Sequence, residues 1–244
     1  MTAGRLSDRR WFLRGLTLSA AALATRGAFA QALARTAATT EGPFYPDTLP
    51  LDTDNDLLLI NDAITPGIGQ ITHLGGRVLG ASGQPIRNAF VEIWQSDNTG
   101  SYVHTGGRQP GGHDRNFQGY GRFLSDGRGQ YYFRTIRPTP YTLRGMFRAP
   151  HIHVAISVNG RRIFTTQLLV RGDEANRRDS LIRRLDPAAR ETLLVDFAPV
   201  PGSSLGELSA NFDIVLGRTA EELEDGQLRG GIGPPEAQRF RRGR

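Results

Sequence analysis

The 244-residue chain contains no cysteine. That absence excludes a disulfide framework, a thiolate metal site and a cysteine nucleophile. Any metal that the chain binds must therefore be held by histidine, tyrosine or carboxylate side chains. The composition, with 38% hydrophobic and 22% charged residues, is that of a globular protein. The length suits one sizeable domain better than two.

The N-terminal region has no apolar run that would span a bilayer comfortably, since residues 15–24 form only a short one. This run follows Asp8-Arg9-Arg10-Trp-Phe-Leu-Arg, which resembles a twin-arginine export motif, and precedes the small-x-small site Ala28-Phe-Ala30. We expect residues 1–30 to be a twin-arginine-type signal peptide, with an ordinary amphipathic N-terminus as the alternative. The mature protein is then expected in the periplasm or outside the cell, without a transmembrane span.

The body of the chain lacks an excess of positive charge, although the formal net charge of the whole chain is +6. Residues 1–30 contain five arginines and one aspartate, so the net charge without them is +2. The last six residues hold four more arginines, which leaves the body at about −2. A basic groove for a polyanion is not expected, and nucleic acid is therefore not a predicted partner.

The chain also lacks a helical period of useful length, and short β-type runs separated by Gly, Pro, Asn and Asp take its place. Strands are expected over residues 72–79, 89–94, 121–124, 129–133, 151–156, 161–170, 193–197 and 209–216, with a short helix over 174–185. The predicted fold is mainly β: an antiparallel β-sandwich over residues 31–217 with long loops and one or two short helices. Residues 218–244 are expected to form a Gly/Pro/Arg-rich tail.

Two tyrosines and a His-x-His pair stand out in the middle of the chain: Tyr102, Tyr141, His151 and His153. Side chains on a strand alternate between its faces, so both histidines are expected to project from one face. The aliphatic residues that would point the other way are Ile152, Val154 and Ile156. This pattern is typical of a strand with one face in a core and the other face lining a site.

Two imidazole nitrogens and two phenolate oxygens would suit a ferric ion better than zinc or calcium. Imidazole binds iron, copper, zinc and nickel alike, so the choice depends on the tyrosines. A tyrosine becomes a good ligand only when a strongly charged cation lowers its pKa from about 10. Two phenolates and one hydroxide would neutralise a trivalent ion. A structural zinc or copper site remains as the alternative.

Several motifs around these residues resemble those of the intradiol ring-cleavage dioxygenases. They are Arg-Pro-x-Pro-Tyr141, Arg148-x-x-His151-Ile-His153, Val91-Glu-Ile-Trp94-Gln95-x-x-x-x-Gly100-x-Tyr102, Thr40-Glu-Gly-Pro-Phe44-Tyr-Pro, Asn116-Phe-x-Gly-x-Gly121-Arg, Thr166-Gln167-Leu and Gly172-Asp-x-x-Asn-x-Arg-Asp. The resemblance covers roughly residues 39–216 and is strongest to the iron-binding beta subunit of the protocatechuate 3,4-dioxygenase branch.

The resemblance implies that Tyr102, Tyr141, His151 and His153 hold a non-haem Fe(III) ion. Its substrates would be a catechol and O2, and the ring would be cleaved between the two hydroxyl-bearing carbons to a cis,cis-muconate. Family precedent also makes Tyr141 the ligand that leaves the metal when the catechol binds, so that it can accept a catechol proton.

Two further residues gain roles from the same resemblance. Arg148 would stabilise negative charge that develops on the ring, because its guanidinium is permanently charged. Gln167 matches a polar position beside the iron ligands. Trp94 and Gln95 are interpreted as fold residues. The remaining histidines, which are expected to be loop or surface residues, are His73, His104 and His113.

Two departures from the family pattern bear on the substrate and the partner. Protocatechuate enzymes usually follow the motif tyrosine with proline and an aromatic residue, whereas Thr142 and Leu143 follow Tyr141 here. A protocatechuate-like catechol is favoured, but its ring substituents stay open. The helical dimerisation segment of catechol and hydroxyquinol 1,2-dioxygenases is not visible, and both a homo-oligomer and an unlike-subunit partner remain open.

A non-catalytic, exported β-sandwich binding module is the alternative from another functional class. Its basis is the stretch Gly76-Arg-Val-x-Gly-x-x-Gly83-x-Pro85-Ile-x-x-Ala89-x-Val91, which resembles prealbumin-like extracellular modules. Such modules have no need of two tyrosines and a His-x-His pair. The presence of that set favours the dioxygenase.

Overall fold

The structure is a computed structural model that describes residues 33–50, 52–61, 64–143, 145–217, 221–222 and 228–229. The expected signal peptide over residues 1–30 and most of the expected tail over 218–244 lie outside the described residues. Within the described ranges, no helix is long and apolar enough to span a membrane.

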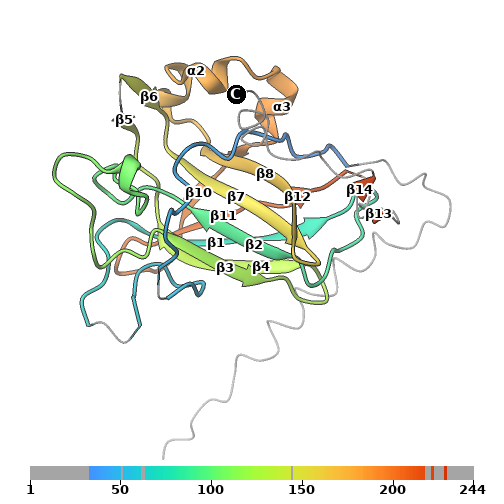
Figure 1. Ribbon diagram of the computed structural model, residues 1–244, viewed down its shortest axis with the longest axis horizontal. Coiled ribbons are helices and arrows are strands. Elements are labelled where there is room, and N and C mark those ends of the chain that lie inside the picture. The colour runs from blue at the N-terminus through green and yellow to red at the C-terminus, as the bar shows by residue number, and fades with distance from the viewer. Residues whose placement is uncertain are drawn as a thin grey trace, which may run out of the picture. The chain divides into compact units, whose positions relative to one another are not determined.

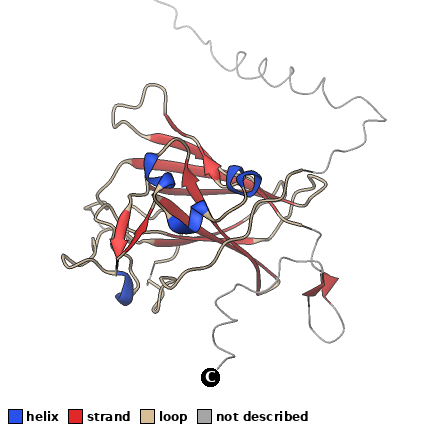
Figure 2. Cartoon of the chain, turned by 90° about the horizontal axis from the view of Figure 1, so that it is seen from above, coloured by secondary structure: helices blue, strands red, loops and turns tan. Residues whose placement is uncertain are grey.

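Two five-stranded sheets make up the fold (Figure 1). The first sheet has the order β10(Phe197–Pro199), β11(Leu208–Asn211), β1(Ile71–Leu79) and β12(Ile214–Val215), and β4(Gln130–Ile136) also pairs with β1. The second sheet has the order β3(Tyr120–Leu124), β2(Phe90–Trp94), β7(His151–Val158), β8(Arg161–Val170) and β9(Leu194–Val195). Strands dominate the described chain, and its helices are few and short (Figure 2).

The remaining elements are small. They are a hairpin of β5(Tyr141–Leu143) and β6(Met146–Arg148), a pair β13(Glu221–Glu222) and β14(Leu228–Arg229), the 3-10 helices η2(Thr105–Gly107) and η3(Glu174–Arg177), and the helices α2(Ser180–Arg183) and α3(Pro187–Glu191). Figure 1 shows the β5–β6 hairpin and α2 on the same side of the second sheet. Residues 102–119 form a long loop that contains η2.

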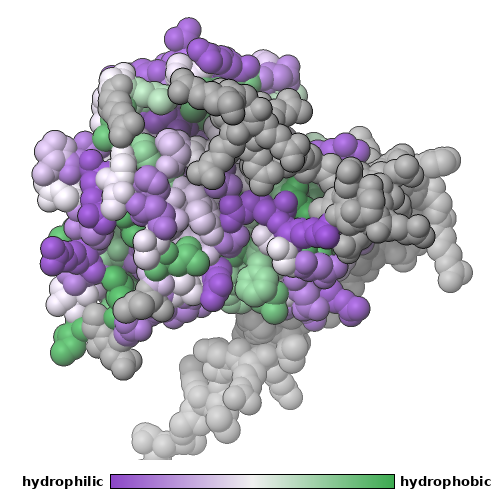
Figure 3. All heavy atoms as spheres, in the orientation of Figure 1, coloured by the Kyte–Doolittle hydropathy of each residue, from purple (hydrophilic) through white to green (hydrophobic). Residues whose placement is uncertain are grey.

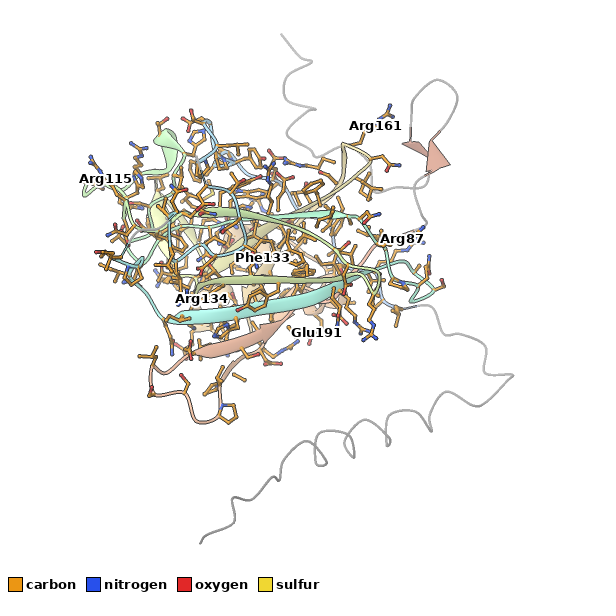
Figure 4. The ribbon with its side chains drawn as sticks, turned by 90° about the horizontal axis from the view of Figure 1, so that it is seen from below. Arg87, Arg115, Phe133, Arg134, Arg161 and Glu191 are labelled. Carbon is orange, nitrogen blue, oxygen red and sulfur yellow. The ribbon has the colours of Figure 1, made fainter. Side chains whose placement is uncertain are left out.

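The main core lies between the two sheets and follows the two-residue period of the strands. Val154 of β7 and Ile93 of β2 meet Leu74 of β1 and Phe133 of β4 in one cluster of buried side chains. Figure 4 shows Phe133 in the interior. On the face drawn in Figure 3, hydrophilic and hydrophobic side chains are interspersed.

The mainly β sandwich predicted from the sequence is confirmed. Most neighbouring strands are antiparallel, but β1 runs parallel to β11 and to β12, and β8 runs parallel to β9. Alternation along a strand reveals which side chains face the core, not the direction of the neighbouring strand. These three parallel pairs are therefore a result of the tertiary structure.

Several local elements differ from the sequence prediction. The helix expected over residues 174–185 is divided into η3 and α2, because Asp179 caps a new helix in the middle of that range. The runs at 193–197 and 209–216 each form two short strands. The β5–β6 hairpin and α3 were not predicted, since elements of three to five residues are too short to show a period.

Replacing Phe133 with alanine should destabilise the protein strongly. The side chain is fully buried between the sheets, and truncation of such an aromatic side chain costs about 3–5 kcal/mol. Leu205→Ala is the matched control, because Leu205 is 71% exposed. Urea unfolding should show the large loss only for Phe133→Ala, and equal losses in the two variants would contradict the core described above.

Candidate metal centre

The two tyrosines and two histidines singled out in the sequence lie together in one buried site. The Tyr102 hydroxyl lies 3.2 Å from Nε2 of His151, which in turn lies 3.2 Å from Nε2 of His153. The ring of Tyr141 is centred 5.5 Å from that of Tyr102 and 5.7 Å from that of His151. Tyr141 is 6% exposed, and the other three are at most 1% exposed.

Strand β7 and the β5–β6 hairpin position these groups. His151 and His153 occupy one face of β7, while Ile152, Val154 and Ile156 point into the main core, as the alternation predicts. Across the sheet, Trp94 of β2 and Gln167 of β8 are the register partners of His153.

In the hairpin, Tyr141 is paired with Arg148. The hairpin therefore brings Tyr141 beside Arg148, which lies three residues before His151 in the sequence. Strands β7 and β8, together with this short hairpin, carry five of the six site residues predicted from the sequence. The sixth, Tyr102, lies in the loop after β2, where its backbone amide donates to the Gly107 carbonyl over 3.0 Å.

The hydrogen bond of His151 defines its tautomer. Its Nδ1 lies 2.6 Å from the Ala149 carbonyl oxygen, which can only accept, so Nδ1 carries the hydrogen. Nε2 of His151 is left with a lone pair directed toward the Tyr102 hydroxyl and His153. Nδ1 of His153 is buried and has no hydrogen-bond partner among the described residues.

Burial keeps both histidines neutral. Loss of solvation, with the nearby Arg148 charge, lowers the pKa of His151 to about 3. Burial and the neighbouring His151 lower the pKa of His153 well below its usual range. A neutral imidazole is the form that binds a metal ion.

Burial has the opposite effect on the tyrosines, because it disfavours the charged phenolate. It raises the pKa of Tyr102 well above 10, and the adjacent Tyr141 raises it further. Burial also raises the pKa of Tyr141, against the opposing effect of the Arg148 charge. Both phenols therefore stay protonated at neutral pH unless a strongly charged cation favours the phenolates.

The donor atoms fit a hard, highly charged metal ion. Within the described ranges, no three His, Cys, Asp or Glu side chains form a metal-binding group. The tyrosines beside the histidine pair supply further oxygen donors. The Nε2 atoms of both histidines and the Tyr102 hydroxyl converge beside the Tyr141 ring, in a space from which solvent is largely excluded.

Arg148 lies beside this site and is held rigidly. It is 5% exposed. Its Nε donates to Oδ2 of Asp179 over 2.9 Å, and its Nη2 donates to Oε1 of Gln167 over 2.6 Å. Gln167 in turn donates through Nε2 to the Thr40 carbonyl over 3.1 Å. This chain of hydrogen bonds fixes the guanidinium next to Tyr141.

Asp179, the last residue of the Gly172–Asp179 motif, was not predicted to have a role at this site. Its Oδ1 caps α2 by accepting from the Leu181 and Ile182 amides, and its Oδ2 accepts from Arg148 and from the Ala149 amide. Burial would raise its pKa, but the Arg148 charge and these hydrogen bonds outweigh burial and lower it. The cap is recognisable in the sequence, whereas the pairing with Arg148 is not.

Aromatic packing around the site was also missed. Trp94, interpreted above as a fold residue, stacks on His153 with ring centroids 4.9 Å apart and an interplanar angle of 7°. Phe44 packs against Tyr102 with centroids 5.1 Å apart. Both contacts join strands or loops that are distant in the sequence.

The other three histidines lie elsewhere. His73 lies 3.1 Å from a carboxylate oxygen of Glu207, and His104 accepts from the Gly106 amide at the start of η2. His113 is half-buried in the loop after η2.

Removing the Asp179 carboxylate should leave Arg148 buried without its counter-charge. We expect Asp179→Ala to lower the free energy of unfolding by about 3–5 kcal/mol, because an unpaired buried charge is costly. Asp186→Ala is the matched control, since Asp186 caps α3 in the same way at an exposed position. Its loss should be about 1 kcal/mol in urea unfolding, and similar losses in both variants would contradict the role given to the Arg148–Asp179 pair.

Comparison with known proteins gives the family. A family model described as Dioxygenase matches residues 40–218. The protocatechuate 3,4-dioxygenase beta chain of Burkholderia cepacia is 35% identical over 186 residues, which cover 73% of this chain and 77% of that one. Catechol 1,2-dioxygenase 2 of Acinetobacter lwoffii is 32% identical over 149 residues, which cover 55% of this chain and 51% of the relative. This chain thus spans 77% of the first relative and about half of the second.

A solved structure of catechol 1,2-dioxygenase from Acinetobacter sp. ADP1 agrees with these matches. It superposes with a TM-score of 0.59 and 26% identity, over 93% of this chain and 73% of that chain. The chain therefore belongs to the intradiol ring-cleavage dioxygenase family.

Proposed function

We propose that the protein is a non-haem Fe(III) intradiol dioxygenase. It cleaves a catechol-type ring between the two hydroxyl-bearing carbons with O2 and yields a cis,cis-muconate. One observation carries the proposal: the Tyr102 hydroxyl and the Nε2 atoms of His151 and His153 converge in a buried site beside Tyr141. That site lies in a chain of the intradiol family.

The four ligands would be Tyr102, Tyr141, His151 and His153. A bound ferric ion would supply Lewis acidity toward both catechol oxygens and the ring. Tyr102 is enclosed on several sides, by Phe44, Tyr141 and His153. Tyr141 is the more exposed of the two tyrosines, and we assign it the role of leaving the metal and accepting a proton from a catechol hydroxyl, as the family resemblance implies.

Arg148 would act on the substrate through its charge. A guanidinium is a delocalised cation, so it can stabilise negative charge on the ring without exchanging a proton. Asp179 and Gln167 occupy its Nε and Nη2 and prevent it from turning away. Gln167 and Asp179 are therefore positioning residues, and the charge near the ring comes from Arg148.

The substrate is proposed to be a protocatechuate-like catechol. Support comes from the relative that is 35% identical and is named as a protocatechuate 3,4-dioxygenase beta chain. One feature departs from the usual protocatechuate pattern: Thr142 and Leu143 follow Tyr141 in the hairpin, where those enzymes usually have proline and an aromatic residue. The ring substituents of the substrate therefore stay open. Anaerobic addition of catechol and of protocatechuate to the iron-loaded protein, followed by visible spectroscopy, would rank the two substrates.

Loss of one phenol oxygen tests the metal site directly. Purified wild-type protein should contain about one iron per chain and show a visible tyrosinate-to-iron charge-transfer band. Tyr102→Phe should lose most of the iron, the band and the activity, because only a phenolate oxygen at this position completes the donor set. Metal analysis and the visible spectrum are the measurements.

Tyr132→Phe is the matched control, because it removes the same oxygen from a tyrosine that is 40% exposed and pairs with His73. It should keep iron, colour and turnover. A wild-type protein that stays colourless after ferric reconstitution, or a Tyr102→Phe variant with unchanged iron and turnover, would overturn the proposal.

We also propose export by the twin-arginine route to the periplasm or the extracellular space. The support is the sequence of residues 1–30, with its paired arginines, short apolar run and Ala28-Phe-Ala30 site. This route carries folded proteins, which suits a chain loaded with its metal before export.

Replacing both arginines of the pair with lysine should block that export. In a bacterial host with twin-arginine transport, the Arg9→Lys/Arg10→Lys variant should remain in the cytoplasm, since the transport receptor reads the pair itself. Arg14→Lys is the control and should be exported normally. Fractionation followed by immunoblotting measures the distribution, and normal export of the double variant would refute the proposal.

A further inference from the structure

A partly buried cluster of charged groups lies beside the metal centre and has no part in the mechanism above. Arg162 of β8 donates through Nη1 to Oε2 of Glu41 over 2.7 Å and through Nη2 to Oε2 of Glu92 over 3.0 Å. The three side chains are between 12% and 23% exposed. We call Glu41, Arg162 and Glu92 the clamp.

The clamp is reinforced by two tyrosines. Tyr45 and Tyr120 both donate to Oε1 of Glu92 over 2.7 Å, and the Arg162 guanidinium lies 4.5 Å from the centre of the Tyr45 ring. Burial alone would raise the pKa of Glu92, but the hydrogen bond from Tyr120 and the Arg162 charge lower it. Glu92 is therefore an ionised carboxylate with a partner on each oxygen.

The clamp holds down residues 40–45, which we call the strap. Glu41 and Tyr45 of the strap contact Arg162 and Glu92, as described above. At the start of the strap, the Thr40 carbonyl accepts from Gln167, and the Thr40 hydroxyl accepts from the Gly42 amide over 3.0 Å. These bonds fix the position of the strap on the second sheet.

This position brings the strap against His153. A Cβ added to Gly42 would lie 3.2 Å from Cε1 of His153, and Gly42 has φ +72°, a conformation that favours glycine. Tyr45 packs edge-on against Trp94 with centroids 5.1 Å apart, and Trp94 stacks flat on His153. His153 thus stacks on Trp94, and Gly42 lies so close to it that a Cβ at position 42 would press on the imidazole.

The two histidines of the site are oriented by different means. A metal-binding histidine usually has its ring fixed by a hydrogen bond from its other nitrogen. His151 has such a bond, to the Ala149 carbonyl. His153 does not, since its Nδ1 has no hydrogen-bond partner among the described residues. Among the described residues, the ring of His153 is oriented by packing against Trp94 and by the contact of its Nε2 with His151.

We infer that the clamp positions His153: by fixing the strap and Tyr45, it holds Gly42 and Trp94 against the imidazole and so directs Nε2 into the metal site. Glu41, Arg162 and Glu92 are positioning residues and do not touch substrate or metal. The inference depends on the proposed function only in that His153 is a metal ligand there.

Removing the positive charge of the clamp should loosen the metal. In the ferric-loaded full chain, Arg162→Met should release iron to a chelator about 10-fold faster than wild type, the size of effect seen when groups supporting a ligand are lost. The electron paramagnetic resonance signal of the ferric ion should also change in rhombicity, because one ligand is less well oriented. Arg162→Lys, which keeps the charge, should restore part of both properties.

Two further variants control the experiment. Arg171→Met removes an arginine that pairs with Glu191 and Asp196 at a more exposed position, and it should behave as wild type. Glu41→Gln is the milder clamp variant and keeps the Arg162–Glu92 pair. It should change release rate and signal in the same direction, and it decides the question if Arg162→Met does not fold.

The outcomes separate this inference from the proposed function. A wild-type protein without ferric iron or its resonance signal would refute the proposed function. A wild-type protein that binds iron, with folded clamp variants that match its release rate and signal, would refute the inference alone. Equal acceleration in Arg171→Met would also refute it, because the effect would then follow from general destabilisation.

Discussion

The site depends on the two-residue period of β7. His151 and His153 lie on one face of this strand, and Ile152, Val154 and Ile156 lie on the other, inside the main core. The same strand therefore carries both the proposed metal-binding histidines and part of the hydrophobic centre of the sandwich. A shift of one residue in its pairing would move the histidines into the core and the aliphatic side chains into the site.

Burial of the site determines the chemical state of its donors. In a poorly solvated space, neutral forms are favoured, so the histidines are ready to bind a metal and the tyrosines stay protonated. Arg148 is the charged exception, and it is tolerated because Asp179 accepts from its Nε over 2.9 Å. With its donors neutral and Arg148 paired with Asp179, the site carries little net charge. Ionisation of Tyr102 and Tyr141 would add two negative charges, which would offset part of the charge of a bound metal cation.

Residues from distant parts of the chain hold the side chains of the site in position. Asp179, the cap of α2, holds Arg148, while the strap and Trp94 enclose His153. The strap is itself fixed by Arg162 and Glu92 on the same sheet. Precise orientation of a donor therefore rests on ion pairs and aromatic packing that do not belong to the reacting groups, as is general for metal sites.

The sequence by itself determined the mainly β class, the strand that carries the His-x-His pair and the donor types available in a chain without cysteine. These features are local, because a two-residue period and a short motif can be read within a few positions. Sequence motifs also predicted site roles for Arg148 and Gln167, and the structure brings these two residues together beside His153. Export could be predicted only from residues 1–30, which lie outside the described structure.

Only the tertiary structure decided the partners of these residues. Arg148 bonds Asp179, which is 31 positions away, and Arg162 bonds Glu41, which is 121 positions away. Such pairs depend on strand order, register and loop path, and no local pattern specifies them. The same holds for the parallel pairing of β1 with β11 and β12, because side-chain alternation is identical in parallel and antiparallel strands.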